Sequence, residues 1–175
     1  MKKLILTAIA ALTFQLSQAQ VEEGESIINL GVGLSPTFYS EDGFEAGLPP
    51  IEASYEYMLK EKISIGGFAG FSTAEFRVNG FDFGFDYTYI LAGVLGNYHF
   101  VNSEKFNAYG GIKLGYNNVS VKEVGTAGNG FVADGSGILY GAQLGARYWA
   151  SGSIGINAEV GYGISLLRAG ITFKL

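Results

Sequence analysis

Residues 154–164 read IGINAEVGYGI, and this stretch decides the fold because two kinds of residue alternate along it without interruption. The apolar set is Ile154, Ile156, Ala158, Val160, Tyr162 and Ile164. The intervening small or polar set is Gly155, Asn157, Glu159, Gly161 and Gly163. Successive side chains of a β-strand point to opposite faces, so this two-residue period predicts a strand with one apolar face. Residues 167–175 repeat the pattern, with an apolar set of Leu167, Ala169, Ile171, Phe173 and Leu175.

Six further segments show the same alternation, at residues 28–35, 51–57, 63–72, 90–100, 108–117 and 139–148. The pattern is weakest in the fourth, where both faces begin apolar. The eight predicted strands have short connections around 60–61, 102–104 and 151–153, a tight turn at 163–165, and longer connections at 38–49, 73–87 and 122–137. Within 73–87, the alternation of Phe81, Phe83 and Phe85 can extend the hairpin beyond the barrel. Short turns at one end and long loops at the other are typical of bacterial outer-membrane barrels.

The two faces differ in a way that predicts which one meets lipid. The non-apolar face is mostly glycine, serine and asparagine, which suits an eight-stranded barrel whose interior is just wide enough for side chains. The apolar face carries aromatic residues near the short turns, as in an interfacial girdle: Tyr57, Tyr98, Phe100, Tyr148 and Phe173. A soluble lipocalin-like barrel is the alternative, and it would need a more polar exterior. We predict an all-β fold, an eight-stranded antiparallel up-and-down transmembrane β-barrel.

Residues 1–19 have the layout of a secretory signal peptide. Two lysines follow the first methionine, an apolar run covers 4–14, and the small residues Ser17 and Ala19 fit the peptidase rule. The apolar run is shorter than the roughly 20 residues that span a bilayer. We expect cleavage after Ala19, which leaves residues 20–175 as a single outer-membrane β-barrel domain.

The mature chain resembles the small eight-stranded outer-membrane barrels of Gram-negative bacteria, the OmpA, OmpX and opacity-type group of porin-family proteins. The resemblance rests on the signal peptide and on residues 98–100, 108–112 and 167–175. In that family the last strand ends in phenylalanine, which the barrel-assembly machinery reads. Here Ile171, Phe173 and Leu175 would form the assembly signal, although the final residue is leucine. We also expect contact with outer-membrane lipid and lipopolysaccharide, and a monomeric protein.

Charged residues on the inward face predict a filled lumen. Six of them are assigned to a lumen charge network: Glu52, Glu56, Lys113, Arg147, Glu159 and Arg168, with Lys174 as a further candidate. Buried charges must be paired to be tolerated. Arg147 and Arg168 lie on the two strands beside Glu159, so we expect Glu159 to pair with them. The charges would then plug the barrel; a gated, narrow ion pathway is the alternative.

Composition excludes several other kinds of site. The chain has no cysteine and one histidine, and its formal net charge of −5 is unsuited to nucleic acid. Enzymatic barrels of this size need a serine, a histidine and an acid at the loop end. His99 is expected at the opposite end, so we predict neither an enzyme nor a cofactor. The acids Glu75, Asp82 and Asp86 in the second long loop lack calcium-loop spacing, and we predict no metal site.

The sequence therefore predicts an outer-membrane barrel with a structural, adhesive or surface-interaction role. A narrow porin-like channel for small solutes or ions is the first alternative, and a lipid-modifying enzyme is the second.

Overall fold

The computed structural model describes residues 21–37, 44–78, 80–125 and 130–175, so the predicted signal peptide lies outside the described residues. Within these ranges the chain forms nine β-strands: β1 Ser26–Gly33, β2 Phe44–Ala46, β3 Ile51–Lys60, β4 Ile63–Arg77, β5 Gly84–Asn102, β6 Phe106–Val124, β7 Val132–Trp149, β8 Ile154–Tyr162 and β9 Leu167–Lys174. No helix in this part of the chain is long and apolar enough to cross a membrane.

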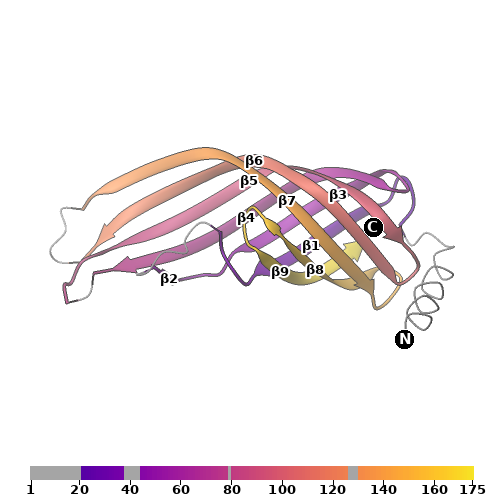
Figure 1. Ribbon diagram of the computed structural model, residues 1–175. Coiled ribbons are helices and arrows are strands. Elements are labelled where there is room, and N and C mark those ends of the chain that lie inside the picture. Colours follow the sequence, from indigo (N-terminus) through magenta and orange to yellow (C-terminus); the bar gives the residue numbers. More distant parts are fainter. Residues whose placement is uncertain (1–20, 38–43, 79, 126–129) are drawn as a thin grey trace, which may run out of the picture.

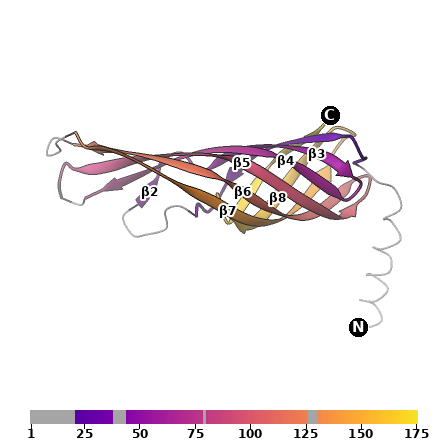
Figure 2. The ribbon, with the colours of Figure 1, turned by 90° about the horizontal axis from the view of Figure 1, so that it is seen from above.

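Eight of the strands close into a ring (Figures 1 and 2). Their order is β4-β3-β1-β9-β8-β7-β6-β5, every neighbouring pair is antiparallel, and β4 pairs with β5 to complete the ring. The first and last strands of the ring meet where β1 pairs with β9. The short β2 lies outside the ring and pairs with the far part of β4. The predicted eight-stranded antiparallel up-and-down barrel is confirmed.

Four strands continue past the ring at one end, which we call the hairpin end. β5 and β6 have 19 residues each, whereas β1 and β9 have 8. The prediction of loops over 73–87 and 122–137 is therefore wrong for most of both ranges. Strand pairing continues there because residues such as Tyr87 keep the alternation and find partners on both sides, Ala74 on β4 and Val121 on β6. The opposite end, with the short connections 61–62, 103–105 and 150–153, is the turn end.

The strand predicted over 154–164 ends two residues early. β8 stops at Tyr162, and Gly163 has a φ of +149°. Only glycine adopts such a conformation readily, and it turns the chain toward the interior. Ile164, predicted on the outer face, is consequently 4% exposed and packs inside the barrel.

The interior is layered along the barrel axis. The turn-end cluster consists of Val21, Ile27, Met58 and Trp149. The hairpin-end cluster consists of Phe68, Ala74, Tyr89, Leu91, Leu95, Leu139 and Ile164. Ile27, Met58 and Trp149 each lie two residues from a buried polar residue on the same strand face, namely Asn29, Glu56 and Arg147. A polar layer therefore lies between two apolar ones.

Candidate functional site

The polar layer brings together the six charged residues assigned to the lumen. Glu52 and Glu56 come from β3, and the others come from β6, β7, β8 and β9: Lys113, Arg147, Glu159 and Arg168. All six are buried, with exposed fractions of 0 to 8%. Five strands thus contribute one or two charges each to a buried interior, where every charge requires a partner.

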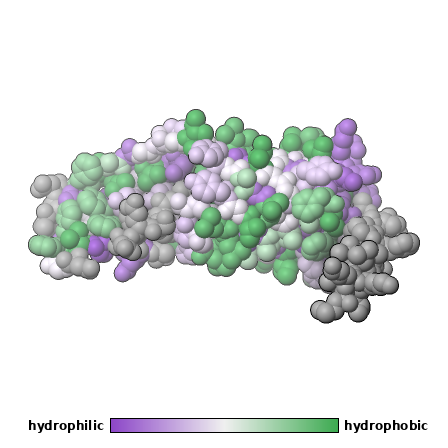
Figure 3. Space-filling view, in the orientation of Figure 1, coloured by the Kyte–Doolittle hydropathy of each residue, from purple (hydrophilic) through white to green (hydrophobic). Residues whose placement is uncertain are grey.

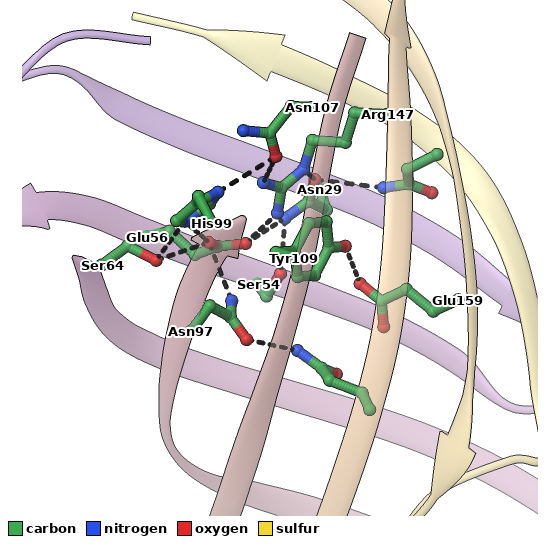
Figure 4. A network of polar contacts seen from close by, with 12 residues as sticks. Asn29, Ser54, Glu56, Ser64, Asn97, His99, Asn107, Tyr109, Arg147 and Glu159 are labelled. Atoms are coloured by element: carbon green, nitrogen blue, oxygen red, sulfur yellow. Dashed lines mark hydrogen bonds and ion pairs between the residues drawn. The ribbon is translucent and has the colours of Figure 1, made fainter. Parts of the chain in front are cut away.

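Glu56 and Arg147 form the centre of the layer (Figure 4). The Arg147 guanidinium forms an ion pair with Glu56 across the barrel. The same carboxylate accepts hydrogen bonds from Asn29 Nδ2 at 2.9 Å, Ser64 Oγ at 2.9 Å and Asn97 Nδ2 at 2.9 Å. Four donors from four strands therefore satisfy one carboxylate, as a stable buried charge requires.

The Arg147 guanidinium is held on its other sides as well. Its Nε donates to Asn29 Oδ1 at 3.1 Å and its Nη1 donates to Asn107 Oδ1 at 3.2 Å. Its Cζ lies 4.0 Å from the centre of the Tyr109 ring, a cation–π contact. Gly145 makes room for this ring, since a Cβ there would lie 2.4 Å from it. The guanidinium is thus fixed by contacts on its edges and on its face.

A second group of charges lies nearer the hairpin end. Lys113 Nζ is 2.6 Å from Glu52 Oε1, and Arg168 forms ion pairs with both Glu52 and Glu159. The Tyr109 hydroxyl donates a hydrogen bond to Glu159. Because the ring of Tyr109 also contacts Arg147, this tyrosine joins the second group to the first. Positive and negative groups therefore alternate through the barrel.

Two expectations about ion pairs need correction. Glu159 pairs with Arg168 as expected, but Arg147 pairs with Glu56 instead. The reason is register: Arg147 lies opposite Asn157 on β8, and Glu159 lies opposite Gly145. The further candidate Lys174 stands apart from the network, half-buried at the turn end, where its Nζ is 3.4 Å from Glu25 Oε1.

The polar layer contains residues that the sequence reasoning did not assign: Asn29, Ser64, Asn97, His99, Asn107, Tyr109 and Gln143. All lie at inward positions of the alternating pattern, which was the available signal. His99 is hydrogen-bonded through Nε2 to Ser64 Oγ and through Nδ1 to Asn107 Oδ1, both at 3.0 Å. The sequence predicts no Ser–His pair at the loop end, which is the hairpin end of the structure. The Ser64–His99 pair lies toward the opposite end, the turn end. Both side chains have zero exposure, so no substrate reaches them.

On the side of the barrel that Figure 3 shows, hydrophobic residues are interspersed with pale, weakly polar ones, and strongly hydrophilic residues gather at the turn end. The residues of the predicted girdle lie toward the turn end: Tyr57, Tyr98, Phe100 and Tyr148 are exposed and Phe173 is half-buried. A second aromatic group, which the sequence reasoning missed, lies on neighbouring strands toward the hairpin end: Tyr116, Tyr140 and Tyr162. Residues such as Val94, Ile112 and Leu144 are more than half exposed between the two groups. The face therefore has an apolar band with aromatic residues on both sides.

The three residues assigned to the assembly signal lie along the last strand and its end. Ile171 and Leu175 are exposed, and Phe173 is half-buried between its neighbours Ile28 and Ile154. The backbones of Leu175 and Ser26 exchange two hydrogen bonds, which continue the pairing of β9 with β1 to the end of the chain.

No group of three or more His, Asp or Glu side chains positioned to hold a metal ion occurs among the described residues. A cavity of about 20 Å³ lies beside the second group of charges and is bordered by Glu52, Lys113, Glu159 and Arg168. A water molecule needs a cavity of roughly 10–15 Å³, so this cavity holds about one water molecule.

No family model and no curated protein matches the chain. Solved structures do. The N-terminal β-barrel domain of Pseudomonas aeruginosa OprF is 12% identical, with a TM-score of 0.58, and the match covers 89% of this chain and 100% of that one. Outer membrane protein OprG from the same organism is 14% identical, with a TM-score of 0.58 and coverage of 90% and 99%. The Ail protein of Yersinia pestis, in complex with the heparin analogue sucrose octasulfate, is 16% identical, with a TM-score of 0.53 and coverage of 87% and 99%.

At these low sequence identities the structural similarities show the fold alone. A transmembrane β-barrel designed de novo also matches, with a TM-score of 0.50, 17% identity and coverage of 89% and 98%. Shared architecture therefore extends to a protein that has no natural role, and function has to be argued from the side chains. The chain has the fold of the small eight-stranded outer-membrane β-barrels, as its resemblance to the OmpA and OmpX type implied.

Proposed function

We propose that the protein is an integral outer-membrane barrel whose lumen is closed by its own side chains and whose hairpin end makes its external contacts. The role is structural or one of surface interaction, without steady transport. The observation that carries this proposal is the set of six buried, ion-paired charges in the interior. A cavity of about 20 Å³ lies beside these ion pairs, and an apolar cluster lies on each side of the polar layer.

The outer face supports a membrane location. Tyr140 and Tyr148 lie eight residues apart on β7 and mark the two aromatic groups. At about 3.4 Å per residue and a strand tilt of about 40°, they are separated by roughly 20 Å along the barrel axis. The apolar band of an outer-membrane barrel is about 25 Å tall. The turn end would then face the periplasm and the hairpin end the exterior.

Biogenesis and surroundings follow from this placement. A signal peptide over residues 1–19 would export the chain, and Ile171, Phe173 and Leu175 would present the last strand to the barrel-assembly machinery. The girdle residues would contact outer-membrane lipid and lipopolysaccharide. The protein would be a monomer, because the closed ring of eight strands leaves no unpaired edge within the apolar band.

The charge of the hairpin end limits what it binds. Among the described residues of this end, 44–50, 73–78, 80–89, 118–125 and 130–138, the acids are Glu45, Glu75, Asp82, Asp86, Glu123 and Asp134, and the bases are Arg77 and Lys122. A sulfated partner such as the heparin analogue bound to Ail would be repelled by this charge. We therefore expect neutral or basic partners. An enzymatic role is disfavoured, because the Ser64–His99 pair is inaccessible.

Conductance tests the proposal against the channel alternative. The protein, refolded and inserted into planar bilayers, should show little or no steady current. A large, stable open state would overturn the closed lumen and favour a channel. Location is tested separately: cell fractionation should place the protein in the outer membrane, and recovery of a folded protein without detergent would contradict it.

A further inference from the structure

The turn end of the barrel contains a contact that neither the ion pairs nor the outer face explains. Val21 precedes the first strand, yet its side chain is completely buried. It packs in the turn-end cluster with Ile27, Met58 and Trp149, which come from β1, β3 and β7. A residue outside the ring thus completes an apolar cluster whose other members belong to three strands of the barrel wall.

The backbone of Val21 is held from a distant part of the chain. Asn102, at the end of β5, accepts a hydrogen bond from Val21 N at 3.3 Å and donates one to Val21 O at 2.8 Å. The side chain of Asn102 is itself oriented, because Asn107 Nδ2 donates to its Oδ1 at 3.2 Å. One amide therefore binds both polar groups of a single residue that is 81 positions away in the sequence.

The residues after Val21 are bound as well. Gly24 N donates to Met58 O at 2.9 Å, and Met58 N donates to Glu25 O at 3.0 Å. Glu22 N donates to Glu25 Oε2 at 2.7 Å, which closes a turn. Gly24 has a φ of +91°, a conformation that glycine adopts at little cost. The segment Val21–Glu25 is thus folded against the wall at the mouth of the barrel.

The cluster that Val21 completes is closed to solvent, since Ile27 and Met58 have zero exposure and Trp149 is 2% exposed. The indole Nε1 of Trp149 and the hydroxyl of Thr172 are buried without a hydrogen-bond partner among the described residues. Both belong to one row of paired residues, Trp149 with Gly155 and Gly155 with Thr172. The complete burial of Thr172 and the near-complete burial of Trp149 mean that solvent does not reach these polar groups while Val21 is in place.

We propose that the mouth at the turn end is a docking site for the chain's own segment Val21–Glu25, and that Val21 is the stopper that excludes water from it. The occupant is identified by the buried valine and by the two-sided hydrogen bonding of Asn102. This closure is separate from the ion-paired layer, which lies further inside, and it operates whether or not that layer conducts.

Thiol labelling tests the stopper. The chain has no cysteine, so Thr172→Cys places a single thiol inside the mouth, and it removes a hydroxyl that bonds to nothing described. In the folded protein, purified after expression of the full chain, a charged methanethiosulfonate reagent should label this thiol slowly. Adding Val21→Asp should speed labelling by at least about tenfold, because labelling of a buried group follows the population of the open state. Val132→Asp, the same change at an exposed site on the hairpin end, should leave the rate unchanged.

A second variant keeps the test decisive if Val21→Asp fails to fold. Asn102→Ala leaves the valine in place but removes its clamp, and it should give an intermediate labelling rate. Trp149, the only tryptophan, should at the same time emit at longer wavelength and be quenched more readily by acrylamide. Fast labelling of Thr172→Cys in the otherwise unchanged protein would overturn the proposal. Equally slow labelling in a folded Val21→Asp or Asn102→Ala protein would also overturn it. Bilayer conductance is a different readout, so the closed lumen and the stopper can fail independently.

Discussion

The contact between Glu56 and Arg147 gives the sharpest prediction about stability. Glu56→Gln keeps the size of the side chain but removes its charge and turns one acceptor oxygen into a donor. All four groups that bond to the carboxylate are donors, so the new amide faces at least one of them with a second donor. Arg147 is left completely buried without a carboxylate partner.

The expected loss follows from that geometry. Removing one partner of a buried ion pair costs about 3–5 kcal/mol, because the remaining charge stays desolvated. An apolar cluster lies on each side of the polar layer, which limits the water that can relieve this cost. A loss of this size is a large share of a total stability of about 5–15 kcal/mol. Arg147→Met should be similarly costly, and the double variant should cost about 0.5–3 kcal/mol less than the two single losses together.

Unfolding by urea in phospholipid vesicles measures these free energies, with Trp149 fluorescence and gel mobility as two probes. The matched control is the half-buried pair of Glu25 and Lys174 at the turn end. Glu25→Gln should cost about 0–1 kcal/mol, as for other pairs near solvent. If the losses for Glu56→Gln and Arg147→Met add to within about 0.5 kcal/mol, the two side chains are not coupled and the reasoning is refuted.

Three further outcomes are expected. Gly145→Ala should lower the unfolding free energy by about 1–3 kcal/mol, because its Cβ would displace the Tyr109 ring; an unchanged urea midpoint would contradict that packing. Val160→Arg, on the outer face of β8, should cost about 2–4 kcal/mol in vesicles if the site lies near the bilayer midplane, whereas Val132→Arg on the hairpin end should cost little. Equal costs at these two valines would argue against the assigned membrane band. The unheated protein should migrate differently from the boiled one on a detergent gel, and identical migration would indicate that no stable barrel forms.

The sequence predicts which side chains face the interior of the barrel, but it does not predict which of them contact one another. The inward position of Arg147 follows from strand alternation alone, because the side-chain period is two residues. Its partner does not follow, because it lies on β3, which is not a neighbour of β7 in the ring. Contacts across a lumen depend on how the strands are staggered around the whole barrel. Alternation along single strands carries no information about that stagger, which is why Glu159 was expected to bind Arg147.

Patterns along single strands also do not predict two features at the ends of the barrel, namely the long strands of the hairpin end and the buried Val21 of the turn end. The alternation continues through Tyr87 and Val121, but composition rich in glycine and acids made these regions read as loops. Val21 carried no periodic signal at all, because it lies outside every strand. Its backbone is bound by Asn102, a contact over a long sequence distance that no local pattern reveals.

The polar layer also bears on how the barrel selects one register. Sliding a strand by one residue moves every inward side chain to the lipid face. For β3 such a slip would expose Glu52 and Glu56 to hydrocarbon, and charged groups there are strongly disfavoured. For β5 hydrophobicity alone does not distinguish the correct register from one shifted by a residue, because Leu91 and Leu95 face inward while Ile90 and Val94 face outward. Its register is therefore set at the turn end of the strand, where Asn97 bonds to Glu56 and His99 bonds to Ser64 and Asn107. These polar contacts mark the inner face of a strand whose apolar residues do not, which gives the buried layer a role in specifying the fold as well as in closing it.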